Sequence, residues 1–125
     1  MIWHRNPPRP SSFELKRMDQ IRNEGCILTW HKLDRQVMAE IHHLIDGNRR
    51  RGHLYTIALS PWYHRSIRDE GLTEGQMLEL YGPSIAHGSK LFERVHGITE
   101  MELWQLQQRR LGLDDTLPTS RITRR

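Results

Sequence analysis

Two β-prone segments, separated by a turn and followed directly by a helix start, constrain the fold of this chain more than any other feature. The first segment, Glu40–Ile45, carries two adjacent histidines, and the second, His53–Leu59, is placed to return antiparallel after the Gly47-Asn48 turn. Ser60-Pro61 then has the composition of a helix start, with serine as N-cap and proline in the first turn. The sequence therefore predicts an α+β fold built around a strand, loop, strand, helix unit.

The histidines of this unit are candidates for a metal site. Adjacent residues of a strand point to opposite faces, so His42 and His43 cannot have the same role. His64 falls in the predicted helix, where it can face the same point as His42, with His43 nearby. A one-metal nuclease needs imidazoles both to hold a divalent cation and to act as general base. The alternative is that these histidines are hydrogen-bonded structural groups.

Length and composition favour one small domain. The chain has 125 residues, enough for a single modest core. It contains no apolar run long enough to span a membrane and no apolar core of a signal peptide, and its one cysteine, Cys26, excludes an internal disulfide framework. We therefore expect a cytoplasmic protein without membrane contact. Its predicted parts are an extended N-terminal arm, a folded domain and a mobile basic tail, at residues 1–11, 12–112 and 113–125.

Basic residues near the histidine pair indicate a polyanionic partner. The formal net charge is +4, and Arg49, Arg50 and Arg51 lie in the predicted turn after the pair. Phosphate contacts supply most of the non-specific affinity for nucleic acid, so we assign these arginines and Lys90 to DNA-backbone contacts. No segment has the form of a base-reading element, so little sequence specificity is expected. The alternative is that the arginines form a solvated turn.

The remaining segments are expected to be scaffold. Cys26–Trp30 is a short β-prone run and predicts a further strand. Apolar residues of the last predicted helix are assigned to core packing, with a homodimer interface as the alternative. Capping-box patterns and a Pro-Ser start predict helices over residues 12–24, 73–81, 83–95 and 99–111.

Five segments together resemble a known family. At this order and spacing, over about residues 17–97, they resemble the phage recombination-enhancing nucleases of the Ref type. The resemblance implies an HNH-type endonuclease of phage or prophage origin, with a ββα-metal core, that hydrolyses DNA phosphodiester bonds in recombination together with RecA filaments. The segments are Ile21–Cys26, Glu40–Leu44, Arg49–His53, Tyr55–Arg65 and Tyr81–Lys90.

The resemblance also implies roles for individual histidines. His42 matches a metal-ligand position, His43 the general base, and His64 the metal ligand on the helix. His87 matches a further family position and is either an additional site residue or a packing group. The implied cofactor is one divalent cation, Mg2+ or Mn2+. The middle asparagine of the HNH pattern is missing, because Tyr55 stands at its usual place.

The chain departs from the family at a presumed structural zinc knuckle. The family carries C-x-x-C before the histidine pair and L-C-P-W-H-H at the helix start, where this chain reads Cys26-Ile27-Leu28-Thr29 and Leu59-Ser60-Pro61-Trp62-Tyr63-His64. Hydroxyl groups are poor zinc ligands, so no structural zinc is expected. We expect hydrogen bonds among Thr29, Ser60 and Tyr63, with tryptophan packing, to replace the metal.

Loss of the knuckle leaves a second interpretation open. The chain is then a catalytically degenerate HNH-fold protein that acts as a DNA-binding module or as a phage-encoded inhibitor or adaptor of a host protein. A decayed enzyme often loses its base early, whereas this chain keeps His42, His43 and His64 together. The retained histidines favour the enzyme.

Overall fold

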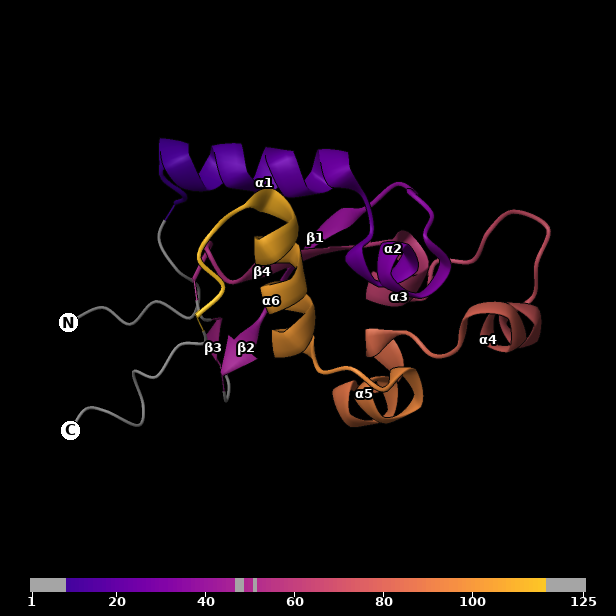
Figure 1. Ribbon diagram of the computed structural model, residues 1–125. Coiled ribbons are helices and arrows are strands. Elements are labelled where there is room, and N and C mark those ends of the chain that lie inside the picture. Colours follow the sequence, from indigo (N-terminus) through magenta and orange to yellow (C-terminus); the bar gives the residue numbers. More distant parts are fainter. Residues whose placement is uncertain (1–8, 47–48, 51, 117–125) are drawn as a thin grey trace.

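The structure is a computed structural model in which residues 9–46, 49–50 and 52–116 are described. An antiparallel pair of strands, β1 (Glu40–His43) and β4 (Thr56–Leu59), lies at its centre, and the register sets His42 opposite Ile57 (Figure 1). A second short pair, β2 (Ile45–Asp46) with β3 (Arg49–Arg50), extends the ribbon. The predicted Gly47-Asn48 turn lies outside the described residues.

Helices cover this ribbon on several sides. Helix α1 runs above the strands and α6 crosses them, while α2 and α3 lie beside them and α4 and α5 are farther out (Figure 1). The chain is thus an α+β protein, as predicted. Its helices are α1 (Ser12–Glu24), α2 (Ile27–Leu33), α3 (Pro61–Arg65), α4 (Glu74–Tyr81), α5 (Ser89–His96) and α6 (Glu100–Leu111), with a 3-10 turn η1 (Ile85–His87).

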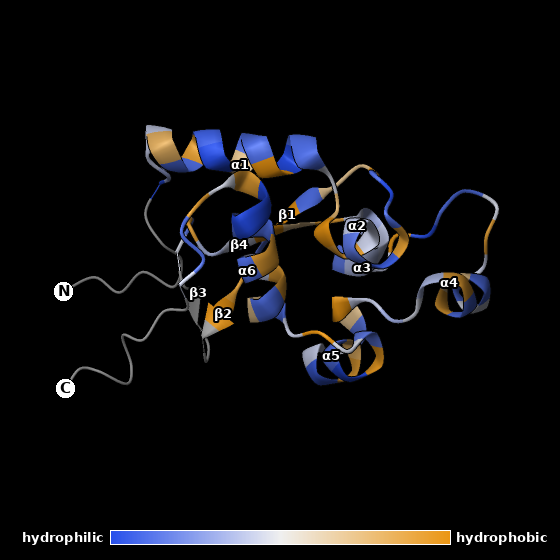
Figure 2. Cartoon of the chain, viewed as in Figure 1, coloured by the Kyte–Doolittle hydropathy of each residue, from blue (hydrophilic) through white to orange (hydrophobic). Residues whose placement is uncertain are grey.

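The core forms around β4. All four residues of this strand are buried, because α1, α2 and α6 contact it while β1 pairs along its edge. Strand β1 is only partly buried, so its histidines can reach the surface. Figure 2 shows the apolar stripes of the surrounding helices. The largest fully buried side chains include Ile21, Leu28, Ile57, Met77, Phe92 and Leu103.

Arg17 joins three of these elements from inside the core. Its guanidinium, on α1, donates to Thr56 Oγ1 at 2.6 Å on β4 and to Gln108 Oε1 at 2.6 Å on α6. A third bond reaches the Thr56 carbonyl at 3.1 Å. The side chain is buried, and burial lowers its pKa to about 10. Arg17 is therefore a cationic clamp held by neutral acceptors.

The predicted helix starts are confirmed at three capping boxes. Ser11, Thr73 and Thr99 each cap the backbone N–H three residues ahead and receive the reciprocal side-chain bond. Ser60 caps α3 in the same way, through the N–H of Tyr63 at 3.2 Å. Among the described residues, no helix is both long and apolar enough to cross a bilayer.

Three sequence predictions of local structure are wrong. Cys26–Trp30 does not form a strand, because the Cys26 thiol caps the Thr29 N–H at 3.4 Å and starts α2. The helix predicted for 83–95 is interrupted at Gly88, whose φ of 118° separates η1 from α5. The second strand begins at Thr56 and not at His53, since the Tyr55 N–H closes a turn onto the Gly52 carbonyl.

Candidate metal and nuclease centre

His42 and His64 are brought together by the strand, strand, helix order. His42 lies on β1, and α3 begins directly after β4, which places His64 beside it. The centroids of the two rings are 5.3 Å apart and their planes cross at 67°. The two residues that the sequence predicts as metal ligands are therefore neighbours.

Each of these imidazoles is hydrogen-bonded to a carboxylate. His42 Nε2 is 2.9 Å from Glu100 Oε1, at the start of α6, and His64 Nδ1 is 2.9 Å from Glu40 Oε1 on β1. The opposite ring nitrogens, His42 Nδ1 and His64 Nε2, make no hydrogen bond to the described residues. A carboxylate on one nitrogen fixes the tautomer and orientation of a histidine that binds metal through the other.

Glu40 is held ionised by its neighbours. Arg65 donates to both carboxylate oxygens, from Nε at 2.8 Å and from a terminal nitrogen at 2.6 Å. This bidentate contact is the largest cause that lowers the pKa of Glu40 to about 2, with a further contribution from His64, while burial opposes it. An ionised Glu40 accepts the His64 N–H, and the free nitrogen of that ring then keeps its lone pair.

Glu100 is more enclosed. Its burial alone raises the pKa of the carboxyl group, but the hydrogen bonds from His42 and Ser89 outweigh that effect and leave the pKa below its ordinary value. Its backbone N–H is also anchored, on Glu93 Oε2 at 2.8 Å. Glu100 is the first residue of α6, where the helix dipole favours a negative charge.

His43 contacts another histidine, His53. Its Nε2 is 3.0 Å from Nδ1 of His53, and the ring centroids are 5.2 Å apart. His53 comes from the turn before β4, where the Thr56 hydroxyl donates to its carbonyl at 3.0 Å. Sequence reasoning missed His53. No signal in the sequence identified it, because residues 53–59 were predicted as a strand, whereas His53 lies in the turn before Thr56, the residue paired with His43.

His87 is not grouped with the other predicted site residues. Its Nδ1 accepts the Ser84 N–H at 2.9 Å, its Nε2 is 3.1 Å from Glu74 Oε2, and its ring packs on Trp62 at 5.6 Å. These contacts join η1 to α3 and α4, which corresponds to the packing alternative.

The predicted phosphate-binding residues are spread over two elements. Arg49 and Arg50 form β3, next along the chain to the β2 strand that follows the histidines. Arg51 lies outside the described residues. Lys90 is exposed near the start of α5.

The four presumed zinc-knuckle positions form two helix starts. Cys26 caps Thr29 on α2, and Ser60 caps Tyr63 on α3. Burial raises the pKa of Tyr63, so its hydroxyl stays neutral and donates to the Tyr81 carbonyl at 2.9 Å. Of the predicted hydrogen bonds among Thr29, Ser60 and Tyr63, the one between Ser60 and Tyr63 is present, through the Tyr63 backbone N–H, whereas the Thr29 N–H donates to Cys26.

An open cleft of 530 Å3 adjoins His42 and Glu100. Glu93 and Glu100 contribute two carboxylates to its wall, so the cleft by itself repels a phosphate group. Within the described parts of the chain, no group of three or more His, Cys, Asp or Glu side chains is arranged to hold a metal ion. The imidazole in the wall of this cleft is that of His42, which is hydrogen-bonded to Glu100.

Comparison with known proteins gives one match. A family model described as recombination enhancement, RecA-dependent nuclease, matches residues 10–111, which include every residue of the candidate centre. No curated protein and no solved structure matches the chain.

Proposed function

The chain belongs to the family of recombination-enhancing, RecA-dependent nucleases, and from this premise we propose that it is a metal-dependent, HNH-type DNA endonuclease of phage or prophage origin. One observation carries the proposal. His42 and His64 are adjacent, and each is hydrogen-bonded on one nitrogen to a carboxylate, which leaves the other nitrogen for a cation. In this proposal β1, β4 and α3 are the ββα-metal core.

The residues present fit one divalent cation, Mg2+ or Mn2+. His42 and His64 would hold it, and phosphate oxygens and waters would complete its coordination, because two imidazoles alone bind Mg2+ weakly. The acidic cleft beside His42 supports this fit. Its carboxylates alone would repel a phosphate group, and the positive charge of a bound cation would offset that repulsion. When bound, the cation supplies electrostatic stabilisation of the scissile phosphate and the leaving 3′ oxygen.

His43 is the proposed general base. It takes a proton from the attacking water. In this proposal the His43 Nε2–H donates to His53 Nδ1, 3.0 Å away, and this contact orients the ring. His53 is therefore a positioning residue, which acts on the reaction by orienting His43.

The basic segment around β3 is proposed to bind the DNA backbone. Arg49, Arg50 and Arg51, with Lys90, would contact DNA phosphates, which gives salt-dependent binding with little sequence preference. RecA filaments would present the DNA. In this proposal the filament, and not this chain, selects the cutting site.

The test is nicking of supercoiled plasmid and of RecA-bound DNA with Mg2+ or Mn2+. We expect His43→Ala to lower the cutting rate by about 100-fold or more, the usual contribution of a general base. His31→Ala is the matched control, because His31 is exposed on α2 and has no contact with the centre. Equal cutting by His43→Ala and wild type rejects the base assignment. No cutting by either, with or without RecA, favours the degenerate DNA-binding or adaptor protein.

A second experiment tests the ligand pair without relying on cleavage. Glu100→Gln should weaken Mn2+ binding by about 10- to 100-fold, because the amide cannot accept the His42 N–H as strongly as a carboxylate. Glu74→Gln is the control, since Glu74 bonds His87, a histidine outside the proposed pair. Titration calorimetry measures both affinities. The same Mn2+ affinity in the two variants contradicts the assignment of His42.

A further inference from the structure

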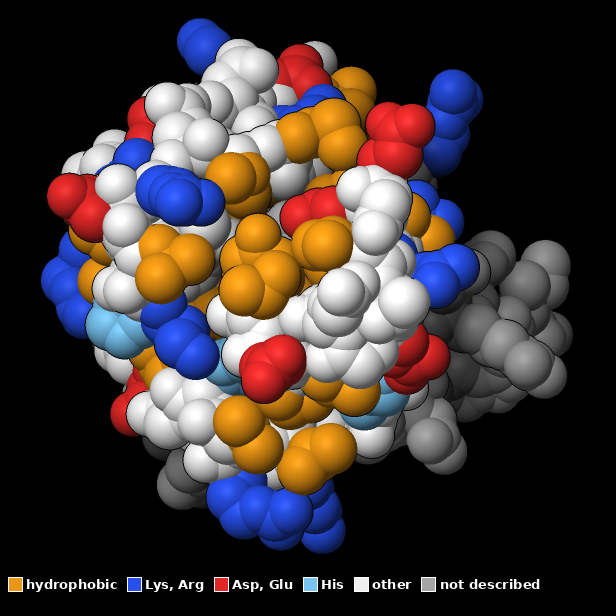
Figure 3. All heavy atoms as spheres, turned by 90° about the vertical axis from the view of Figure 1, so that its right-hand side faces the viewer, with side chains coloured by type: hydrophobic (Ala, Val, Ile, Leu, Met, Phe, Trp, Pro, Cys, Tyr) orange, Lys and Arg blue, Asp and Glu red, His pale blue; other side chains and the backbone are white. Residues whose placement is uncertain are grey.

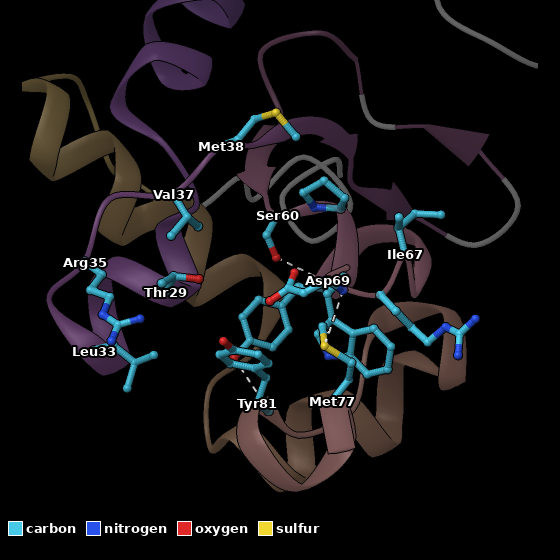
Figure 4. A pocket seen from close by; sticks show the side chains of 14 residues that line it. Thr29, Leu33, Arg35, Val37, Met38, Ser60, Ile67, Asp69, Met77 and Tyr81 are labelled. Carbon is cyan, nitrogen blue, oxygen red and sulfur yellow. Dashed lines mark hydrogen bonds between the residues drawn. The ribbon is translucent and has the colours of Figure 1, made fainter. Parts of the chain in front are cut away.

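An apolar groove opens between α2, α3 and the segment leading into α4. Its volume is 320 Å3. Figure 3 shows apolar side chains gathered in the middle of this face, with charged groups around them, and Figure 4 shows the labelled lining residues converging from separate elements. Neither His42 nor His43 lines it, so the groove is distinct from the candidate metal centre.

Aromatic side chains form the floor of the groove, and their polar atoms are hydrogen-bonded to the backbone beneath it. Trp62 Nε1 donates to the Gly82 carbonyl at 2.9 Å, and the Tyr63 hydroxyl donates to the Tyr81 carbonyl at 2.9 Å. Both side chains are buried, so the accessible apolar surface of the groove comes mainly from its rim. At the rim, Leu33, Met38 and Ile67 are 46%, 72% and 47% exposed. Apolar side chains this exposed, around a cavity, are typical of a site that a partner covers.

Charge at the rim indicates the chemistry of that partner. Arg35 and Arg68 both line the groove, and neither makes a hydrogen bond or ion pair with the residues that the structure describes. Asp69 is the only acidic side chain in the lining, so cations outnumber anions there. A partner segment that combines an apolar side chain with a carboxylate satisfies both features.

A second copy of this chain fits the groove poorly. In a two-fold dimer both copies of the patch are buried together, so Arg35 and Arg68 of each subunit share the interface with a single carboxylate from each, Asp69. Like charges at such an interface repel and remain unpaired. The occupant is therefore a different protein, and the family of this chain depends on one.

We propose that this groove binds RecA, by receiving an apolar side chain of a RecA subunit that has a carboxylate beside it. The inference rests on the proposed function only through the RecA dependence of the family, and it uses none of the histidines. Ser60 to Tyr63 line the groove while His64 follows in the same short helix. A bound RecA segment would thus contact the element that carries a proposed metal ligand.

The test measures binding to RecA filaments assembled on single-stranded DNA with a non-hydrolysable ATP analogue, compared with the same DNA alone. Met38→Glu should weaken filament binding by about tenfold or more, because a charge at the rim opposes burial of an apolar side chain. Val95→Glu is the matched control, since Val95 is 52% exposed on α5 and does not line the groove. Affinity for DNA alone should stay unchanged in both variants.

A second variant tests the charges. The double variant Arg35→Glu and Arg68→Glu should lose filament binding by a similar factor, whereas a purely apolar site would not respond. Wild-type binding by Met38→Glu, or no difference between filament and DNA alone for the native protein, overturns the proposal. A dimer in sedimentation analysis that Met38→Glu dissociates also overturns it, in favour of a second copy.

His43→Ala separates this proposal from the nuclease assignment. The variant should bind filaments as the native protein does, because His43 is not part of the groove. If the native protein binds filaments but has no nuclease activity, the RecA-binding role of the groove is retained and only the proposed chemistry is rejected. Loss of binding in Met38→Glu with metal-dependent nicking of free plasmid intact would locate the defect in the groove alone.

Discussion

His96 is a buried imidazole with both ring nitrogens in use. Nε2 donates to the Pro83 carbonyl at 2.9 Å, so Nδ1 is the acceptor of the Lys32 ammonium at 2.8 Å. Tyr63 and Phe92 pack edge-on against the ring. Burial is the main cause that lowers the pKa of His96, and the charge of Lys32 acts in the same direction, while the bond to Pro83 opposes them. The folded protein therefore favours the neutral ring.

This lowered pKa makes stability depend on pH. As pH falls below about 6.5, the ordinary value for histidine, the unfolded chain binds a proton at His96 that the folded chain resists. The free energy of unfolding should therefore decrease from pH 7.5 to pH 5.5 at this site. In His96→Gln the decrease should be smaller than in the native protein, as measured by urea unfolding at both pH values. His31→Gln, on the exposed side of α2, should retain the native slope.

At this scale the sequence identified the histidines but not their partners. Strand alternation and the helix start after Leu59 were sufficient to place His42 beside His64. Glu100 is 58 positions from His42 in the chain, and no local pattern relates the two. His53 could not be assigned either, because the sequence placed it inside a strand and the structure places it in a turn.

Among the elements, α6 has the most direct effect on the candidate centre. Thr99 caps its first turn through the Glu102 N–H at 3.0 Å, and Glu100 follows the cap directly. The position of the carboxylate that bonds His42 therefore depends on a fixed helix start. Helix α4 has the same capping box at Thr73 but carries no residue of the centre.

These two caps form a matched pair for mutation. Thr99→Ala and Thr73→Ala should each lower the free energy of unfolding by about 1 kcal/mol, the usual value of an N-cap. Only Thr99→Ala should also weaken Mn2+ binding, because it loosens the residue next to Glu100. Calorimetric titration with Mn2+ beside urea unfolding distinguishes the effects. Equal metal affinity in both variants would show that Glu100 is positioned without its cap.

The elements also show where local sequence signals fail. Capping boxes predicted three helix starts correctly, since both partners are within four residues of each other. Cys26–Trp30 was assigned to a strand, although a short apolar run is compatible with either a strand or a helix. In the structure the Cys26 cap and the burial of Ile27 and Leu28 favour the helix. The glycine that separates η1 from α5 was present in the sequence, but its positive φ was not predicted.

On the scale of the whole molecule, Arg17 holds the first helix, the central strand and the last helix together. It has no carboxylate partner among the described residues, so its hydrogen bonds to Thr56 and Gln108 must offset the cost of burying its charge. The planar guanidinium can reach both acceptors at once, which a lysine ammonium cannot do in the same geometry.

Replacement of Arg17 should therefore destabilise the entire fold. We expect Arg17→Met to lower the free energy of unfolding by about 2–3 kcal/mol, because Gln108 Oε1 loses its donors inside the core. Arg17→Lys should recover only part of this loss. Arg22→Met, at an exposed ion pair on the same helix, should change stability by about 0.5 kcal/mol or less. Chemical unfolding of the three variants at pH 7 measures these differences, and equal losses in Arg17→Met and Arg22→Met would contradict the clamp.

The position of Glu100 in α6 has a consequence for synthesis of the protein. A ribosome releases His42, His43, His53 and His64 well before it releases the helix that contains the carboxylate bonded to His42. A nascent chain, or a message cut short before that helix, would carry all these histidines without the support of Glu100 and without the Gln108 side of the clamp. The proposed centre would thus be complete only after the last helix has folded onto the rest.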